Sequence, residues 1–475
     1  MITYYYCMNP SVFIKESLLD ATAAEAFAWH ARPGAIERLS PPWDPLRVIS
    51  RTGGIQPGAE VVMRLKAGPF PFRWQARHTE YEEGRLFQDE QIRGPFASWT
   101  HTHRFEAVGE GRCRLQDTVR YLPPLAGLTR PVAGPLIRRQ LERIFAFRHR
   151  LTAADLALHR QYRDQPRQTV VISGAGGLIG SRLVPFLTTG GHRVLKLVRR
   201  QPVAEDEIFW DPAAGRIDTD RLEEARPDAV IHLAGANVGQ GRWTAARKKE
   251  ILDSREKGTT LIAATLARME HAPRSFLSAS AIGFYGDRGE ELLTEKSGPG
   301  EGFLARVCRQ WEDAVSPAVE QGIRAVKMRI GVVLTPEGGA LKQYLPLFRA
   351  GLGGRIGSGR QYISWIGMDD AVGAIYSLLM SEDAAGPVNV VSPRPVTSRE
   401  FARILGQVLR RPAIMPVPAG LVKLAYGEMG QEAVLFSARV EPSRLIEARY
   451  PFMYSRLRPC LSHLLGKPDT RGVHE

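Results

Sequence analysis

The stretch TVVISGAGGLIG, residues 169–180, decides the fold of the larger part of this 475-residue chain. Its first residues predict a buried strand, and the glycines that follow predict a tight turn. The residues SRLVPFLTTG (181–190) then predict a helix, and HRVLKLV (192–198) predicts a second strand. Strand, glycine-rich turn, helix and strand form a unit that binds dinucleotides, because glycines let the backbone approach a pyrophosphate at the helix N-terminus.

The glycines of this turn have a spacing that resembles the short-chain dehydrogenase/reductase superfamily rather than the G-x-G-x-x-G motif of other dehydrogenases. The resemblance implies an α/β Rossmann domain, a doubly wound parallel sheet with helices on both faces. It also implies that the cofactor is bound by Gly174, Gly177, Leu178, Ile179 and Gly180.

Two arginines, Arg199 and Arg200, follow the second predicted strand. Proteins that bind NAD usually carry an acidic residue there, which holds the ribose 2′-hydroxyl. A guanidinium group suits a 2′-phosphate instead, because the two can pair through two hydrogen bonds. We therefore predict NADP as the cofactor. Two solvated surface arginines are the structural alternative.

A further element of the predicted cofactor site is DAVIHLAGANVG, residues 228–239. Its apolar run predicts a buried strand that ends in a turn of small residues. The end of this strand resembles the N/H-x-A-G element of short-chain dehydrogenases, which passes beside the ribose of the cofactor. The resemblance implies that His232, Ala234 and Gly235 lie at the cofactor.

Catalytic residues are expected after the next predicted strand, SFLSAS at 275–280. The segment SASAIGFYG (278–286) resembles the S-S-x-x-Y-G segment of extended short-chain dehydrogenases. The resemblance assigns the catalytic serine to Ser280, with Ser278 as the neighbouring alternative. The structural alternative is that either serine only forms a hydrogen bond at the end of the strand.

The Tyr-x-x-x-Lys pair that these enzymes normally use is missing. In that pair the lysine lowers the pKa of the tyrosine, so that the phenolate can take a proton from the substrate. In FLARVCRQWE (303–312), Leu304 and Cys308 occupy the two positions. Tyr285, which is close to Ser280 in the sequence, is therefore predicted to carry out the proton transfer. A tyrosine packed in a turn is the structural alternative.

Several more segments resemble one branch of the extended short-chain class, the epimerase-type proteins described as sugar-nucleotide epimerases. They include RWTAARKKEILDSREKGT (242–259), RIGVVLTPEGGAL (329–341), GSGRQYISWIGMDDAV (357–372) and the terminal PVPAGLVKLAYGEMGQEAVLFSARVEPSRL (416–445). The resemblance covers about residues 168–465 and departs at Gly367, where the branch commonly has histidine. It implies a Rossmann domain at 168–392 and a small C-terminal substrate lobe at 393–475.

The first of these segments carries five basic residues beside the expected cofactor cleft. They are Arg242, Arg247, Lys248, Lys249 and Arg255. A solvated helix face accounts for such a run of charge. Recognition of a phosphorylated substrate is the functional alternative.

Residues 1–163 have no glycine motif. Their short runs of alternating apolar and polar residues predict half-buried antiparallel strands, and the run 134–162 has the apolar spacing of a long helix. This order resembles the α+β helix-grip fold of polyketide-cyclase/START-like proteins, whose cavity commonly holds an apolar ligand. A core filled by its own side chains is the alternative. The polar linker RDQPRQ (163–168) separates this domain from the next.

The composition argues against a disordered, fibrous or collagen-like chain. Hydrophobic residues make up 44% and charged residues 24% of the chain, as in ordinary globular proteins. We expect no membrane span and a cytoplasmic location, because no apolar run reaches about 18 residues and the N-terminus has no signal-like pattern. The four cysteines form no C-x-x-C pair, and His101 and His103 have no third ligand nearby in sequence, so we predict no metal site.

The formal net charge of +14 is spread along the chain rather than gathered in one part. Up to residue 165 there are 23 basic and 17 acidic residues, and 41 and 33 follow. Nucleic-acid binding normally concentrates basic residues in one patch or stripe. We therefore predict no nucleic-acid partner.

These features favour an NADP-dependent oxidoreductase or epimerase-like enzyme, which acts on a nucleotide sugar or another phosphorylated small molecule. Because the usual Tyr-Lys pair is missing, a non-catalytic NADP sensor is a second hypothesis. A carrier of a hydrophobic ligand, which binds through residues 1–163, is a third.

Overall fold

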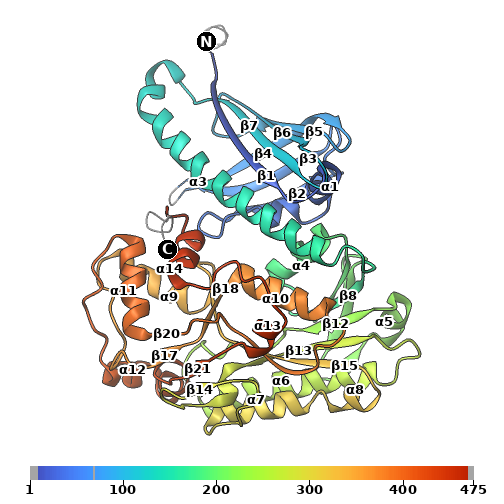
Figure 1. Cartoon of the computed structure of the whole chain (residues 1–475), viewed down its shortest axis with the longest axis vertical. Helices are drawn as coiled ribbons and strands as arrows, with labels where there is room; N and C mark the ends of the chain where they lie inside the picture. The colour runs from blue at the N-terminus through green and yellow to red at the C-terminus, as the bar shows by residue number, and fades with distance from the viewer. Residues whose placement is uncertain (1–8, 68–69, 469–475) are drawn as a thin grey trace. The chain divides into compact units, whose positions relative to one another are not determined.

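The computed structural model describes residues 9–67 and 70–468. The chain divides into two compact units, Met1–Asp164 with Thr188–Gly191 and Gln165–Leu187 with His192–Glu475. The first unit is a mainly antiparallel α+β domain and the second is a doubly wound α/β domain (Figure 1). Both predicted fold classes are confirmed.

Seven antiparallel strands form the sheet of the first unit, in the order β1-β7-β6-β5-β4-β3-β2. They are β1 Ser11–Leu19, β2 Arg47–Thr52, β3 Glu60–Ala67, β4 Phe70–Glu82, β5 Leu86–Arg93, β6 Ser98–Ala107 and β7 Cys113–Leu122. Buried side chains alternate with more exposed ones in β6, where His101, His103 and Phe105 are buried, and in β7, where Leu115, Asp117 and Val119 are buried. The period-two pattern of the sequence therefore reflects a sheet with one covered face.

The long helix α3, Ala126–Gln161, lies along this sheet, and α1 Ala23–Ala31 and α2 Ala35–Arg38 precede β2 (Figure 1). α3 begins eight residues before the predicted start at 134 and contains Pro131 and Pro135. Proline usually interrupts a helix, which obscures this first part in the sequence. In the core, the ring of Phe27 lies 6.0 Å from Phe87 and 5.6 Å from Phe105.

Eight strands form the main sheet of the second unit, in the order β11-β10-β9-β8-β12-β13-β15-β19. They are β8 Thr169–Ser173, β9 Arg193–Val198, β10 Glu207–Asp211, β11 Arg216–Ile217, β12 Ala229–His232, β13 Ser275–Ala281, β15 Arg324–Ile330 and β19 Gly386–Val390. All neighbours are parallel except β10 and β11. The chain order reverses beside β8, and ligands of such sheets bind at the carboxyl ends of the strands at this switch point.

Helices cover both faces of this sheet. In Figure 1, α6 Ala245–Leu266, α7 Phe303–Asp313 and α8 Ser316–Glu320 lie on one face, and α4 Gly180–Thr189 and α10 Met368–Met380 lie on the other. α5 Thr219–Ala225 precedes β12, and the 3-10 helix η2 Ile282–Tyr285 follows β13.

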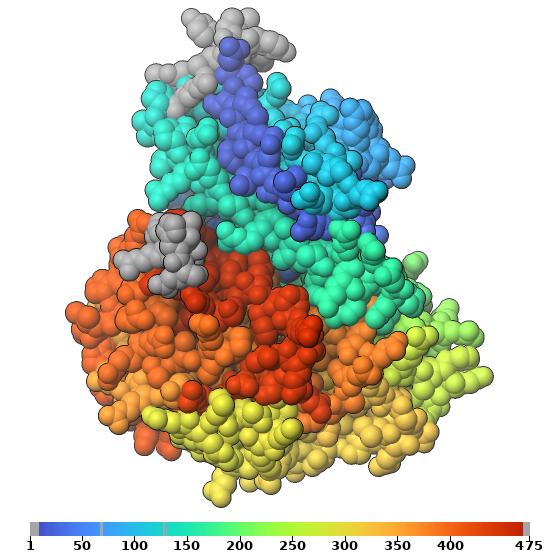
Figure 2. Space-filling view, in the orientation of Figure 1, coloured from blue at the N-terminus to red at the C-terminus, as the bar shows by residue number. Residues whose placement is uncertain are grey.

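The C-terminal segment packs into the same unit instead of forming a separate body. Its elements are β20 Val396–Thr397, α11 Ser398–Leu409, α12 Ala419–Tyr426, η3 Gly430–Val434, β21 Arg439–Val440, α13 Ser443–Glu447 and α14 Leu457–Leu464. Phe401 of α11 and Leu461 of α14 share an apolar core with Phe348 of α9 Gly339–Arg349. Figure 2 shows the red C-terminal atoms packed among orange ones of this unit. No boundary between compact units falls at residue 393.

Two short strand pairs also join this segment to earlier parts of the unit. β14 Leu292–Leu293 pairs with β21, and β17 Tyr362–Ile363 pairs with β20. Earlier in the same unit, β16 Val332–Leu334 pairs with β18 Trp365–Gly367. Among the described residues, no helix is both long and apolar enough to cross a membrane. Cys113, Cys308 and Cys460 are buried free thiols, and Cys7 lies outside the described residues.

Candidate cofactor and catalytic site

The glycine turn joins β8 to α4. Gly174 has a left-handed backbone with a φ of +72°, and its carbonyl oxygen accepts a 2.9 Å hydrogen bond from the Gly177 amide. A methyl group added at Gly180 would lie 2.2 Å from the same carbonyl oxygen, so no side chain fits there. A methyl group at the exposed Gly176 would meet no other atom within 4 Å. The turn is therefore closed at Gly180 and open at Gly176, as the approach of a ligand to the backbone requires.

Leu178 and Ile179 are half-buried between this turn and α4. A methyl group at Gly338 would lie 2.5 Å from Leu178 Cδ1, so the leucine side chain rests on Gly338 at the start of α9. Leu178 therefore anchors the turn to the segment between β16 and α9.

A buried contact joins the carboxyl ends of β8 and β12. Ser173 Oγ lies 2.5 Å from His232 Nδ1 and accepts a 3.2 Å hydrogen bond from the Leu233 amide. His232 is completely buried, and this burial, together with the positive charge of Arg255, lowers the pKa of His232 to about 3. The imidazole is therefore neutral and holds the two strand ends together, instead of presenting itself on the surface of the site.

Ala234 and Gly235 continue from the end of β12. A methyl group at Gly174 would lie 2.8 Å from the Ala234 nitrogen, so the two turns are in close contact. Gly235 is exposed, and a methyl group there would lie 3.3 Å from the guanidinium carbon of Arg255. Arg255 in turn donates a 3.0 Å hydrogen bond to the carbonyl oxygen of Ala236. The glycine turn and the small-residue turn thus lie next to each other at the switch point.

The two arginines after β9 differ in their surroundings. Both are exposed, but Arg200 donates hydrogen bonds to both carboxylate oxygens of Glu207, which lowers the pKa of that carboxyl group. Within the described part of the chain, Arg199 makes no hydrogen bond or ion pair. Arg199 is therefore the one of the two that is available to a bound anion.

Ser280 and Tyr285 belong to one buried network rather than to an open pocket. Ser280 Oγ donates a 2.8 Å hydrogen bond to Glu312 Oε1. Arg329 pairs with both oxygens of Glu312, at 2.8 and 2.9 Å, and its third nitrogen donates to the Tyr285 hydroxyl at 3.0 Å. The carboxylate and the guanidinium thus link the two predicted catalytic residues, which make no direct hydrogen bond to each other.

The Tyr285 hydroxyl is fully enclosed. It lies 2.7 Å from Asn389 Oδ1 and 3.0 Å from the Thr294 carbonyl oxygen, and either oxygen can accept a hydrogen bond from it. Burial raises the pKa of Tyr285, and the side chain is 0% exposed. At neutral pH the residue is an un-ionised phenol with no free surface.

The residues that replace the usual tyrosine and lysine lie beside this network. Cys308 is buried, and burial raises its pKa to about 11. A methyl group at Gly283 would lie 3.2 Å from Leu304 Cβ, so this glycine makes room for the leucine. A leucine and a neutral thiol cannot replace the proton transfer of a Tyr-Lys pair at neutral pH.

Each of the five basic residues from 242 to 255 has partners inside the chain. Arg242 donates to the carbonyl oxygens of Leu424 and Ala425, Arg247 to Asn237 and Glu250, Lys248 to Glu428, Lys249 to Asp253, and Arg255 to Ala236 and Ile251. These contacts give the basic residues a structural role, so they do not by themselves indicate a binding site for a substrate phosphate.

A surface pocket of about 590 Å³ lies where α6, the start of α7 and the C-terminal segment meet. Its lining carries charges of both signs, including Lys248, Arg306 and Glu432. Glu432 accepts hydrogen bonds of 2.9 and 2.8 Å from the amides of Phe303 and Leu304, which are the free donors at the start of α7. The C-terminal segment thus caps the helix that carries the replaced pair.

The departure at Gly367 also has a packing reason. A methyl group there would lie 2.8 Å from Cys460 Sγ, so a histidine would displace α14. The following Asp369 instead contacts His463 of α14, whose Nε2 lies 3.0 Å from Asp369 Oδ2. A histidine is therefore present beside this aspartate, but α14 supplies it.

Sequence reasoning missed three members of the buried network, Glu312, Arg329 and Asn389. Each is less than 7% exposed, and Arg329 and Asn389 lie within the strands β15 and β19. A charged residue inside an otherwise buried strand is the signal that could have identified Arg329, because such a charge needs a partner.

Three family models match separate parts of the chain. Residues 170–391 match the NAD-dependent epimerase/dehydratase family, and residues 19–145 match the polyketide cyclase/dehydrase and lipid transport family. Residues 417–464 match a domain of unknown function, DUF1731. The first match contains the glycine turn and Ser280, and the second contains most of the helix-grip unit.

Individual relatives extend these matches. An epimerase family protein of Mycobacterium tuberculosis is 39% identical over 299 residues, which make up 63% of this chain and 98% of the relative. The nucleoside-diphosphate sugar epimerase of Corynebacterium glutamicum is 31% identical in sequence with a TM-score of 0.77, over 96% of this chain and 90% of that one. Human SDR39U1, solved with NADPH, is 30% identical with a TM-score of 0.58, over 62% of this chain and 99% of that one.

Proposed function

The chain belongs to the NAD-dependent epimerase/dehydratase family, and on that premise we propose that it binds NADP(H) and acts as an oxidoreductase or epimerase on a phosphorylated small molecule such as a nucleotide sugar. The observation that carries the cofactor proposal is Arg199, an exposed guanidinium at the end of β9 with no partner among the described residues. No acidic side chain takes its place at the end of this strand.

The glycine turn fits a dinucleotide. Side chains are excluded at Gly174 and Gly180, whereas Gly176 leaves the backbone open beside the start of α4. A pyrophosphate placed there would meet the N-terminal amides of the helix. Gly177, Leu178 and Ile179 continue this cradle, and Ala234 and Gly235 form its neighbouring wall. His232 acts through Ser173, because its own side chain is buried.

Among the two arginines, Arg199 pairs with the 2′-phosphate, and Arg200 keeps the loop after β9 in place through Glu207. The NADPH bound to the human relative supports the same choice of cofactor. The nicotinamide supplies hydride transfer when it is bound. The residues of this chain orient the substrate and move its proton.

We assign to Ser280 the transfer of a proton to or from the substrate. Ser280 lies two residues beyond the last pair between β12 and β13, His232 with Ser278, at the carboxyl edge of the sheet. Glu312 accepts its hydrogen bond and Arg329 balances the charge of Glu312. Tyr285 is a positioning residue in this scheme, because its hydroxyl group accepts a hydrogen bond from Arg329 and donates its proton to Asn389 or to the Thr294 carbonyl oxygen.

A panel of nucleotide sugars tests the proposal. Purified protein is mixed with NADP⁺ or NADPH and with each sugar, and the nicotinamide absorbance and the sugar stereochemistry by NMR are followed. Turnover of at least one compound is the expected result. If the cofactor binds but none of the sugars is turned over, the second candidate, an NADP sensor, is favoured. Two observations fit a sensor: Ser280 and Tyr285 form hydrogen bonds inside the chain, and Leu304 and Cys308 replace the usual Tyr-Lys pair.

A further inference from the structure

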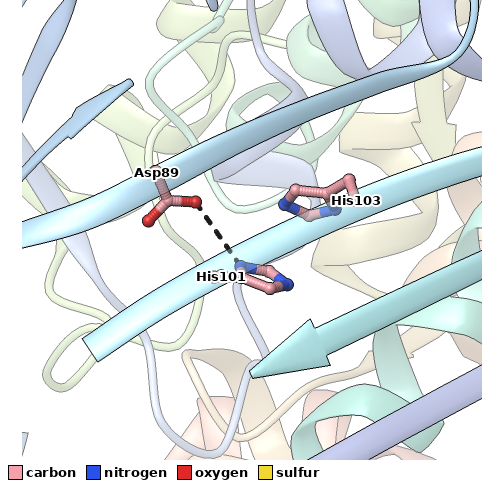
Figure 3. A group of neighbouring side chains, drawn as sticks. All are labelled: Asp89, His101 and His103. Atoms are coloured by element: carbon pink, nitrogen blue, oxygen red, sulfur yellow. Dashed lines mark ion pairs between the residues drawn. The ribbon is translucent and has the colours of Figure 1, made fainter. Parts of the chain in front are cut away.

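The first unit contains a cluster of imidazole and carboxylate groups that the proposed function does not use. His101 and His103 lie on the buried face of β6, and Asp89 lies opposite His101 on β5. One ligand atom from each of the three lies within 4.8 Å of the others (Figure 3). The third ligand that the sequence did not reveal therefore comes from the neighbouring strand.

The strand register brings these groups together. Asp89 pairs with His101 across β5 and β6, and His103 pairs with Asp117 across β6 and β7. Directly paired residues of an antiparallel sheet point to the same face, and so do residues two apart on one strand. The side chains of Asp89, His101, His103 and Asp117, all of types that can bind a metal ion, therefore lie on the covered face of the sheet. They occupy neighbouring positions on three adjacent strands.

A carboxylate, Asp117, lies behind the histidines and holds the orientation of His101 through a hydrogen bond. His101 Nε2 lies 3.1 Å and His103 Nδ1 lies 2.6 Å from Asp117 Oδ1, and His149 Nε2 of α3 lies 2.7 Å from Asp117 Oδ2. His101 can therefore donate Nε2–H to Asp117, which leaves Nδ1 without a proton on the side of Asp89. A carboxylate that orients the far side of an imidazole is the usual outer support of a metal-ligating histidine.

The separation of the His101 and Asp89 ligand atoms suits a metal ion. His101 Nδ1 lies 3.5 Å from Asp89 Oδ2. An ion about 2.1 Å from both atoms would be bound at an angle of about 113°, close to the tetrahedral value that zinc sites adopt. His103 Nδ1, although close to Asp117, is a buried nitrogen without a correctly directed hydrogen bond among the described residues.

The surroundings of the cluster combine aromatic and basic groups. The ring of His30 lies 5.8 Å from that of His103, and Arg148 interacts electrostatically with Asp89 and Asp117. His101 and His103 are 5% and 8% exposed, and the ring of His103 stacks on Phe87 at 4.2 Å. The carboxylate of Asp117 is buried in this core, and that of Asp89 is half-buried. Buried carboxylates are stable only when cations or hydrogen-bond donors compensate them.

We propose that Asp89, His101 and His103 bind one divalent transition-metal ion of the zinc type, with Asp117 as the carboxylate that orients His101. Two imidazoles and one carboxylate favour such an ion over Mg²⁺ or Ca²⁺, which prefer all-oxygen sites. With three protein ligands, a fourth position is left for a water molecule or for another small ligand.

A proton can compensate the same carboxylates. Hydrogen bonds to Asp117 and Asp89 raise the pKa of His101 to about 9 against the opposing effect of burial. In that case a protonated His101, rather than a metal ion, would compensate the carboxylates. The two explanations differ in whether the purified protein binds a metal ion.

The experiment uses the full chain, stripped with EDTA and dialysed against Zn²⁺ or Co²⁺ with an excess of Mg²⁺. We expect one equivalent of zinc per chain, visible absorption bands from bound Co²⁺, and a rise in the melting temperature with zinc. The substitutions Asp89→Asn and His103→Gln should each lower the affinity for zinc by about 100-fold or more. Loss of a residue that only orients a metal ligand typically lowers the affinity by about 10–100-fold.

Thr102→Val is the matched control, because Thr102 lies between the two histidines on the opposite face and bonds Gln88. It should keep the full equivalent of zinc. Far-UV circular dichroism checks that each variant is folded, and if His103→Gln is not, Asp89→Asn provides the comparison. If the unaltered protein takes up no zinc, or if folded Asp89→Asn takes up as much as Thr102→Val, the site does not exist and the proton on His101 accounts for the cluster.

Discussion

Arg329 and Glu312 form a buried pair in the second unit, joined by hydrogen bonds of 2.8 and 2.9 Å, and both predicted catalytic residues depend on it. Ser280 donates to the carboxylate and Tyr285 accepts from the guanidinium. Arg329 also lies with its guanidinium carbon 3.5 Å from the ring centre of Phe284. The pair therefore fixes the end of β13 and the η2 turn that follows it.

We predict that Glu312→Gln destabilises the protein by about 3–5 kcal/mol, because removal of one partner leaves the other charge buried and uncompensated. Urea unfolding measures the change. Glu291→Gln is the control, since Glu291 pairs with Arg288 at the surface, and its loss should cost about 0–1 kcal/mol. Equal effects of the two substitutions would show that the buried pair contributes no more than a surface pair.

Gly176→Ala separates cofactor binding from folding. The position has room for a methyl group and no positive φ, so we expect an unchanged melting temperature. If the pyrophosphate approaches the backbone there, NADPH affinity should fall by about tenfold or more, the equivalent of about 1.4 kcal/mol. Gly298→Ala, which also meets no atom within 4 Å, should change neither quantity. If Gly176→Ala binds NADPH as tightly as the unaltered protein, the pyrophosphate does not bind next to this residue.

The stability of the second unit should depend on pH through His232. Its folded pKa is about 3, whereas an unfolded histidine titrates near 6.5. Below about pH 6.5 the unfolded chain takes up a proton that the folded chain does not, so stability falls as the pH falls. Between about pH 7 and pH 5 the loss from this one group is about 2 kcal/mol.

His232→Gln should remove that part of the acid sensitivity. Urea unfolding at the two pH values measures it, and His271→Gln is the control, because His271 is exposed. An unchanged pH dependence in His232→Gln would mean that the imidazole becomes charged in the folded protein.

Much of the fold could be predicted from the sequence, because local patterns report it directly. The glycine spacing predicted the turn between β8 and α4, and alternating residues predicted the strands of the first unit. The start of α3 was less visible, since Pro131 and Pro135 lie inside the helix.

Contacts between distant residues could not be predicted in the same way. Glu312, Arg329 and Asn389 are far apart in the sequence and meet only because α7, β15 and β19 pack together. The pairing of Asp89 with His101 likewise depends on the register of β5 and β6. The expectation of no third ligand for His101 and His103 used distance along the chain, which strand pairing overrides.

Ser280→Ala tests the assignment of the proton. Once a substrate is known, we expect turnover to fall by about 10²–10⁴-fold, the usual contribution of an acid or base, with NADPH affinity unchanged. Ser278→Ala is the matched control, because Ser278 is also buried on β13 and its side chain makes, among the described residues, only a 3.4 Å hydrogen bond to the Ala279 carbonyl oxygen. A large loss in Ser278→Ala and none in Ser280→Ala would transfer the role to Ser278.

The central claim is that this chain is built to bind NADP(H), with Arg199 at the 2′-phosphate. Calorimetry at fixed salt concentration compares NADPH and NADH on the unaltered protein, on Arg199→Ser and on the control Arg193→Ser, an exposed arginine at the other end of β9. We predict that NADPH binds at least about tenfold more tightly than NADH, that Arg199→Ser removes the difference and that Arg193→Ser keeps it. Equal affinities for the two cofactors in the unaltered protein, or a preference that survives Arg199→Ser, would contradict it.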